Sequence, residues 1–303
     1  MKRLFRLLFV TLTTATLLSL STVARAQSEP PPLPLHAVEG AGGVFVTLTA
    51  YLVNPPAKPG VLGKPSLGVT YIGLGNGRNL KVVTLTEAVT DRVELGYSHQ
   101  DLDLGDLPAA IESATSVRIS EGSVGLQQFS ARVLLGKESK RSPAVTFGVH
   151  YKTNADTSAI DRELGGTLHG IGVTGDSGWD YTLYASRLLT GGRRPVLINA
   201  GLRSTQAAHT GLLGFTDDRS LVAEGSVVVF TTSRLLLGAE YRQKPDNYTP
   251  LPGLIGGEDD WWTLCAAYIV DSRTTVAGGY AHLGEVLNHT ANISWGIAVK
   301  HEL

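Results

Sequence analysis

The chain has 303 residues, 43% of them hydrophobic, and carries 26 Lys and Arg against 27 Asp and Glu. This near-neutral charge lacks the basic footprint of nucleic-acid binding, and the single cysteine, Cys265, excludes an intramolecular disulfide. No apolar run after residue 26 is long enough for a membrane-spanning helix, so a membrane protein of this sequence has to cross as a closed sheet.

The first 26 residues have the form of a cleaved export signal. Lys2, Arg3 and Arg6 precede an apolar stretch over 7–20, and Ala24-Arg25-Ala26 is a small-residue cleavage site. Removing residues 1–26 takes away four basic residues and no acid. The mature chain then has 22 Lys and Arg against 27 Asp and Glu, a net charge of −5. The signal predicts export through the periplasm.

Residues 27–63 are predicted to be a Pro-rich linker followed by an N-terminal segment. Pro30-Pro31-Pro32-Leu33-Pro34 favours an extended chain. The stretch 43–53 alternates like a strand, but it would be the thirteenth, and bacterial single-chain barrels have even strand numbers. It would also begin outside the cell. We therefore expect this segment to lie outside the strand ladder, either inside the barrel or under its periplasmic mouth.

Residues 64–303 are predicted to form the barrel. Apolar residues at alternate positions indicate twelve strands, and the connections between them are alternately short and long. This order is typical of periplasmic turns and extracellular loops, with 75–78 as a short exception, and a soluble β-sandwich has no reason to show it. The predicted fold is all-β, an up-and-down antiparallel transmembrane β-barrel in the outer membrane of a Gram-negative bacterium. The strands are expected near 65–74, 79–87, 92–100, 124–135, 143–152, 179–188, 195–203, 220–230, 234–243, 261–270, 274–283 and 292–303.

Five segments repeat a unit in which a glycine lies on the polar face of an alternating stretch. On a membrane barrel this face points inward, because the apolar face meets lipid. Glycine there either relieves strain where the sheet curves, or leaves room beside a molecule in the lumen. Curvature is the preferred interpretation. The segments are Val93–Tyr97, Val145–Val149, Ile198–Leu202, Leu235–Tyr241 and Val276–Tyr280.

The last strand shows both faces. Trp295 and Ile297 share one face, which suits lipid, whereas Ser294 and Lys300 share the other, which suits a wet lumen. The alternation from Ile293 to Leu303 resembles the C-terminal signal read by the barrel assembly machinery, although that signal usually ends in an aromatic residue. The expected partners are outer-membrane lipid and this machinery.

Charges of both signs fall on the predicted inward faces. Lys152, Arg203 and Arg242 lie near the outer ends of their strands and could form a basic rim above Glu224 and Glu240, which would favour anionic solutes in a pore. The alternative is a salt-bridge network that braces a closed lumen, because buried charges are normally paired. A twelve-stranded barrel is intermediate in width between filled and open barrels, so both interpretations stay open. The candidate lumen-lining residues are Arg92, Glu94, Arg132, Lys152, Asp180, Arg203, Glu224, Glu240 and Arg242.

Catalytic signals are weak. The chain has no G-x-S-x-G and no H-E-x-x-H motif. The acidic groups in the expected outer loops, such as Glu258-Asp259-Asp260, do not have the spacing of a calcium loop. The sequence therefore predicts no catalytic residue, no cofactor and no metal site.

Motifs along the mature chain carry a family resemblance. They are Gly40–Pro55, Val93–Tyr97, Asp161–Gly166, Gln243–Asp246 and Pro252–Trp261. In these stretches the chain resembles a proteobacterial family of outer-membrane proteins, the domain of unknown function thirty thirty-four. Leu48 stands where that family has proline, which makes the N-terminal segment easier to form as a strand. The resemblance implies an outer-membrane barrel and implies no activity.

Three functions are consistent with these patterns. The first is a pore or transporter for a small solute, indicated by the wet inward face with mixed charge. The second is a closed structural or interaction barrel whose long outer loops bind surface partners. The third is a barrel enzyme that acts on lipid or cell-wall material, and the sequence offers the least support for it.

Overall fold

The structure is a computed structural model that describes residues 36–56 and 62–303. The predicted export signal and the prolines at 30–34 lie outside the described residues. Among the described residues, no helix is both long and apolar enough to cross a membrane.

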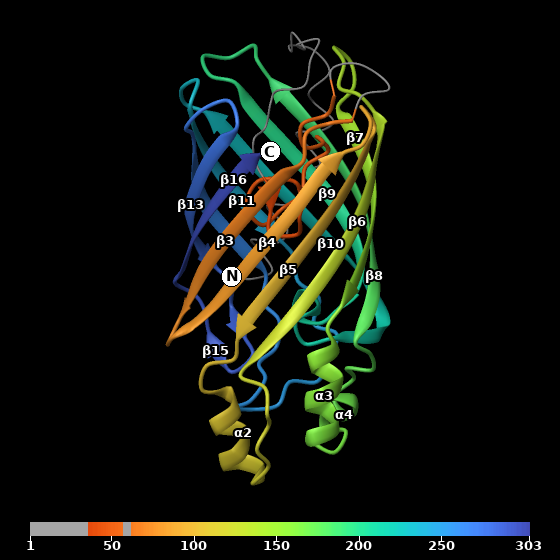
Figure 1. Ribbon diagram of the computed structural model, residues 1–303, viewed down its shortest axis with the longest axis vertical. Coiled ribbons are helices and arrows are strands. Elements are labelled where there is room, and N and C mark those ends of the chain that lie inside the picture. The colour runs from red at the N-terminus through yellow and green to blue at the C-terminus, as the bar shows by residue number, and fades with distance from the viewer. Residues whose placement is uncertain (1–35, 57–61) are drawn as a thin grey trace.

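Twelve antiparallel strands close into a barrel, which confirms the predicted fold and strand number. Each strand pairs with its neighbours in sequence, and the last strand pairs with the first to close the ring, with Val299 opposite Val69 (Figure 1). The barrel strands are β3 (Ser66–Gly75), β4 (Arg78–Ala88), β5 (Val93–Asp103), β6 (Ser123–Gly136), β7 (Ala144–Thr153), β8 (Ser177–Leu189), β9 (Val196–Ala207), β10 (Phe215–Phe230), β11 (Leu235–Arg242), β12 (Trp261–Ile269), β13 (Thr274–His282) and β16 (Ser294–Glu302).

The two faces of each strand differ as the alternation predicts. In β16, Trp295 and Ile297 point outward and are 56% and 48% exposed, whereas Ser294 and Lys300 point inward and are 0% and 4% exposed. Large apolar side chains are exposed in the same way on the barrel strands from β3 to β12. Aromatic pairs such as Tyr151–Trp179, with ring centroids 4.9 Å apart, lie toward the ends of their strands. An apolar exterior of this kind is that of a transmembrane barrel.

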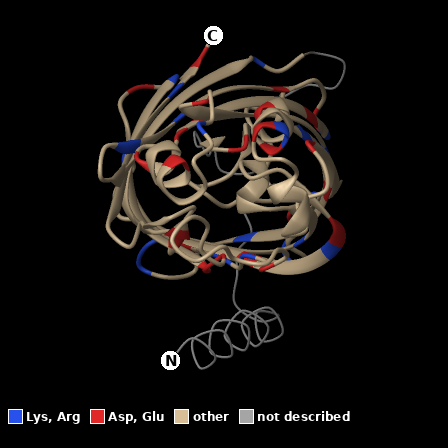
Figure 2. Ribbon diagram, turned by 90° about the horizontal axis from the view of Figure 1, so that it is seen from below, with Lys and Arg blue, Asp and Glu red and all other residues tan. Residues whose placement is uncertain are grey.

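The long connections carry helices and gather at one end of the barrel (Figure 1). The helix α3 (Ala155–Glu163) begins where the Asn154 side chain accepts a hydrogen bond from the Thr157 amide, and Asp156 lies in its first turn, where the helix dipole favours an acid. Viewed from this end, helices and loops lie across the opening (Figure 2). The other elements here are α2 (Leu107–Thr115), α4 (Thr167–Gly170), η1 (His209–Gly211), β14 (Glu285–Val286) and β15 (His289–Thr290).

Residues 36–56 form a plug segment that is separate from the strand ladder, and residues 37–53 of it are all buried inside the barrel. Within this plug segment, β1 (His36–Ala37) and β2 (Ala41–Gly42) pair only with each other. Leu48 and Tyr51 pack in one apolar cluster with inward side chains of the short-turn end, including Leu236. The plug segment therefore supplies part of the barrel's own core.

Two inward glycines of the barrel wall allow this close approach. A Cβ on Gly96 would overlap the carbonyl oxygen of Gly40, and Gly40 itself has a φ of +67°, which glycine adopts at little cost. A Cβ on Gly296 would lie 2.6 Å from the ring of Phe45. At both positions glycine leaves room for the plug segment.

A charge placed on the lipid face should destabilise the barrel. Leu183 lies in the middle of β8 and is 46% exposed. We expect Leu183→Arg to lower the free energy of unfolding in phospholipid vesicles by about 2–4 kcal/mol, measured by denaturant titration of the heat-modifiable folded form. The matched change Leu62→Arg, outside the strands at a side chain that is 66% exposed, should have little effect. Equal losses in both variants would contradict a lipid-facing role for Leu183.

Candidate functional site

A buried carboxylate holds the turn of the plug segment. Glu240, on the inward face of β11, accepts hydrogen bonds from the backbone amides of Phe45, Val46 and Thr47 at 3.0, 3.0 and 2.9 Å. It also accepts one from the Thr47 hydroxyl at 2.8 Å. The chain bends here, so these amides have no sheet partner, and buried amides need an acceptor. Bonds to an ionised acceptor are stronger than bonds to a neutral one.

A second carboxylate, Glu94 on β5, joins two separate points of the plug segment. It accepts from the amides of Gly42 at 3.2 Å and of Val53 at 2.6 Å. Arg132, on the adjacent strand β6, forms an ion pair with Glu94 at 2.7 Å and donates to the carbonyl oxygens of Gly42 and Thr49. Both members of this ion pair belong to the wall, and both form hydrogen bonds to the backbone of the plug segment.

Three cations of the barrel wall converge on one carboxylate of the plug segment. Glu39 Oε1 lies 3.1 Å from Lys152 Nζ and 3.1 Å from Arg242 Nη2, while Glu39 Oε2 lies 2.6 Å from Arg203 Nη2. The side chains of all four residues are at most 4% exposed. We refer to Lys152, Arg203 and Arg242 as the cation cage.

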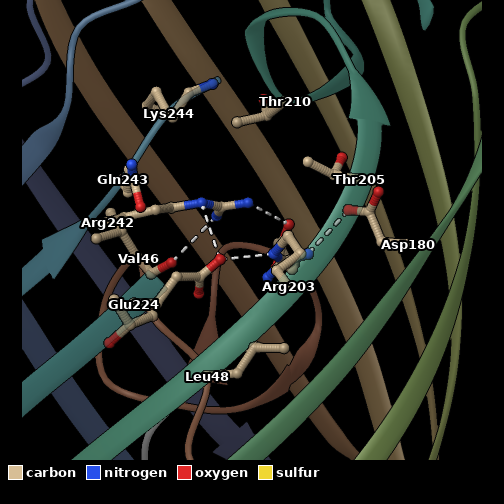
Figure 3. A network of polar contacts seen from close by, with 12 residues as sticks. Val46, Leu48, Asp180, Arg203, Thr205, Thr210, Glu224, Arg242, Gln243 and Lys244 are labelled. Carbon is tan, nitrogen blue, oxygen red and sulfur yellow. Dashed lines mark hydrogen bonds and ion pairs between the residues drawn. The ribbon is translucent and has the colours of Figure 1, made fainter. Parts of the chain in front are cut away.

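Two wall carboxylates complete the network around the cage. Asp180 lies 2.8 Å from Lys152 and 2.9 Å from Arg203. Glu224 lies 2.6 Å from Arg203 and 3.4 Å from Arg242 (Figure 3). The five residues come from the neighbouring strands β7 to β11, whose register brings them to one level. With Glu39 in place, three positive and three negative groups balance, as buried charges require.

The structure places the nine candidate residues in two environments. Eight of them are buried, at most 3% exposed. Arg92 differs: it lies in the exposed turn before β5, where its guanidinium donates to the Leu134 carbonyl at 3.2 Å. Glu39 was not among the residues expected to line the lumen. Only one sequence feature distinguishes Glu39: it is the single acidic residue among the small and apolar residues from Ala37 to Val44.

Narrow cavities adjoin the cage on the side of the outer loops. One of about 20 Å³ is lined by Glu39, Arg242, Thr210 and Trp261, among others. Another of about 10 Å³ is lined by Arg203, Arg242 and Thr210. Each has room for about one water molecule. A cavity of about 60 Å³ lies further out among leucine and isoleucine side chains of α2, α3 and the outer loops.

A second buried polar cluster lies above the cage, in the outer loops. Lys244 forms an ion pair with Glu258, and its ammonium lies 4.9 Å from the centre of the Trp261 ring. Tyr248 Oη and His209 Nε2 are 2.6 Å apart, and the His209 amide donates to Glu258 at 2.6 Å. Burial lowers the pKa of His209 to about 4, so its ring is neutral near pH 7. This cluster joins the β9–β10 and β11–β12 loops over the barrel opening.

The interior offers no metal site, since no group of three or more His, Cys, Asp or Glu in the described parts of the chain could hold an ion. What the cage can do chemically is hold an acidic group through charge-assisted hydrogen bonds. Three donors from two arginines and a lysine already hold one carboxylate in this way.

Solved structures with related architecture include two porins and an outer-membrane protein. The KdgM porin is 7% identical, with 78% of this chain and 99% of that chain covered and a TM-score of 0.49. The NanC porin is 11% identical, with 80% and 100% covered and a TM-score of 0.49. Omp33 of Acinetobacter baumannii is 9% identical, with 80% and 100% covered and a TM-score of 0.41. With TM-scores this low, the fold assignment rests on the strand pairing of the chain itself.

Sequence comparison places the chain in one family. No curated protein matches the sequence. A family model described as "Protein of unknown function (DUF3034)" matches residues 35–300, which include the plug segment and nearly the whole barrel. The chain therefore belongs to the DUF3034 family, as its motifs predicted.

Proposed function

We propose that the protein is an outer-membrane pore for small solutes whose lumen is closed by its own plug segment, residues 36–56. The observation that carries this proposal is a polar wall around a segment that belongs to no barrel strand. A barrel that is only a scaffold can fill its interior with apolar side chains of the strands themselves. Here hydroxyl, amide and charged groups line the middle of the wall, among them Thr84, Ser98, Gln128, Thr146, Thr182, Asn199, Ser226 and Thr263.

The attachment of the plug segment supports a closed state that can open. It is held by side chains such as Glu94 and Glu240, and its backbone adds no strand to the ladder. Withdrawing it would leave all twelve strands paired. The neutral polar groups that it now satisfies would then meet water, which can also form hydrogen bonds with them. A pore of this kind is closed in the state described here and conducts once the plug segment has left.

The proposal includes insertion of the barrel into the outer membrane. The apolar exterior supports contact with outer-membrane lipid, and export through the periplasm would deliver the chain to that membrane. Ile293–Leu303 is the segment that we expect the barrel assembly machinery to bind, since β16 there forms the closing pair with β3.

A closed barrel that binds surface partners is the second candidate, favoured by the architecture of the outer loops. Leu107 and Ile111 of α2 and Ile160 of α3 bury their side chains in a common apolar cluster. This packing gives the outer end a defined surface, whereas loops that merely connect strands need none. Replacing Leu107–Thr115 and Ala155–Glu163 by Gly-Ser linkers separates the two functions, because partner binding should disappear while pore behaviour stays unchanged.

Deleting the plug segment should open the barrel. We expect the variant without residues 36–56, refolded into planar bilayers, to show stable single-channel currents where the full chain shows rare openings. A variant with α2 replaced by a Gly-Ser linker serves as the control and should stay closed, because the plug segment remains in place. A deletion variant that shows heat-modifiable migration yet carries no current would falsify the pore proposal.

Weakening one anchor should raise the frequency of openings without opening the barrel permanently. In Glu240→Gln the acceptor for three amides loses its charge, and hydrogen bonds to charged groups are each worth about 1.5–3 kcal/mol. We expect the open probability in bilayer recordings to rise at least tenfold. Glu112→Gln, at an exposed side chain of α2, is the matched control and should behave like the unchanged chain. Equal open probabilities for Glu240→Gln and the unchanged chain would refute a gating role for Glu240.

A further inference from the structure

The cation cage has an excess of one positive charge when Glu39 is absent. Lys152, Arg203 and Arg242 would then face only Asp180 and Glu224. The cage would also lose the Glu39 carboxylate as a shared acceptor. It now lies 3.1 Å from Lys152 Nζ, 2.6 Å from Arg203 Nη2 and 3.1 Å from Arg242 Nη2. An uncompensated buried charge is strongly unfavourable. A cage without Glu39 therefore favours a replacement anion.

We propose that the cation cage is a binding site for the carboxylate group of a small anionic solute, and that Glu39 occupies it as an internal ligand. The proposal deepens the pore function proposed above, on which it rests, by naming the chemical class of the solute. Entry of the solute and departure of the plug segment are then competing events at one site.

The geometry favours a carboxylate over a phosphate. The two oxygens of Glu39 lie between donors that approach from different strands, Oε1 between Lys152 and Arg242 and Oε2 beside Arg203. A monoanion balances the single excess charge, whereas a dianion would leave the site negative. The additional oxygens of a phosphate would also approach the carboxylates of Asp180 and Glu224, which hold the same cations.

The surroundings place this site on the route from the outer loops. One cavity lies on the outer side of Arg203 (Figure 3). Its lining includes Thr205, Thr210, Arg242, Gln243 and Lys244. The cavity beside Glu39 reaches Trp261, where Arg242 lies 5.7 Å from the ring centre. A solute that arrives from outside would meet the cage before it meets the rest of the plug segment.

Chemical rescue of Glu39→Ala in the full chain tests the proposal. The substitution removes the carboxylate and leaves its space, which acetate can fill. We expect acetate to raise the Tm of the variant by about 2–4 °C over sodium chloride of equal ionic strength, as for a ligand present at several times its Kd. Inorganic phosphate should raise it less. Glu39→Gln is the matched control, because its amide fills the same space, and neither it nor the unchanged chain should respond to acetate.

Refolding provides the second measurement for Glu39→Ala. If the variant does not fold in chloride, acetate in the refolding buffer should restore the heat-modifiable form. Equal Tm values, or equal folding yields, in acetate and chloride would overturn the proposal, as would an equal response of Glu39→Gln. Rescue needs no current, so its failure is distinct from failure of the pore. If the deletion variant conducts and acetate rescues nothing, the solute class is wrong; if acetate rescues and the deletion variant stays closed, the pore is wrong.

Discussion

Pairing of charges across the lumen is the interaction on which the closed state depends. Neither the wall nor the plug segment is neutral within the buried network: Lys152, Arg203 and Arg242 outnumber Asp180 and Glu224, and Glu39 supplies the missing charge. Because unpaired buried charges are strongly unfavourable, each partner requires the other for as long as water is excluded. The same dependence makes the closed state sensitive to any other anion that reaches the cage.

Strand positions and their two faces were predictable from the sequence for a physical reason. Lipid on one side and a polar lumen on the other impose opposite demands on successive residues, so Trp295 and Lys300 reveal their faces without knowledge of any contact. Export topology adds an independent constraint, since short turns and long loops must alternate. Together they indicated twelve strands, as the structure shows, and they led us to expect residues 43–53 outside the ladder.

The partners of the inward residues could not be predicted in the same way. The alternation predicts that the side chains of Glu240 and Glu94 point inward. It does not predict the amides from which they accept hydrogen bonds, because these belong to the plug segment, about 200 residues from Glu240 and about 50 residues from Glu94 in the chain. Arg92 follows the alternation and still lies outside the interior, because its strand begins one residue later. Gly96 looked like a site of curvature, but the Gly40 carbonyl oxygen and the Ser130 hydroxyl occupy the space that a side chain there would need.

Both ends of the plug segment lie near the short-turn end of the barrel. The His36 ring lies 3.1 Å from the Thr84 hydroxyl, and at the other end Asn54 lies 3.2 Å from Lys300 and also contacts Ser66. His36 and Asn54 therefore lie on the same side of the interior, and residues 37–53 turn back within it. A movement of residues 36–56 toward that side would break no strand pair of the barrel, and the same movement in reverse would restore the contacts. Closure by such a segment is repeatable, because the barrel itself stays intact.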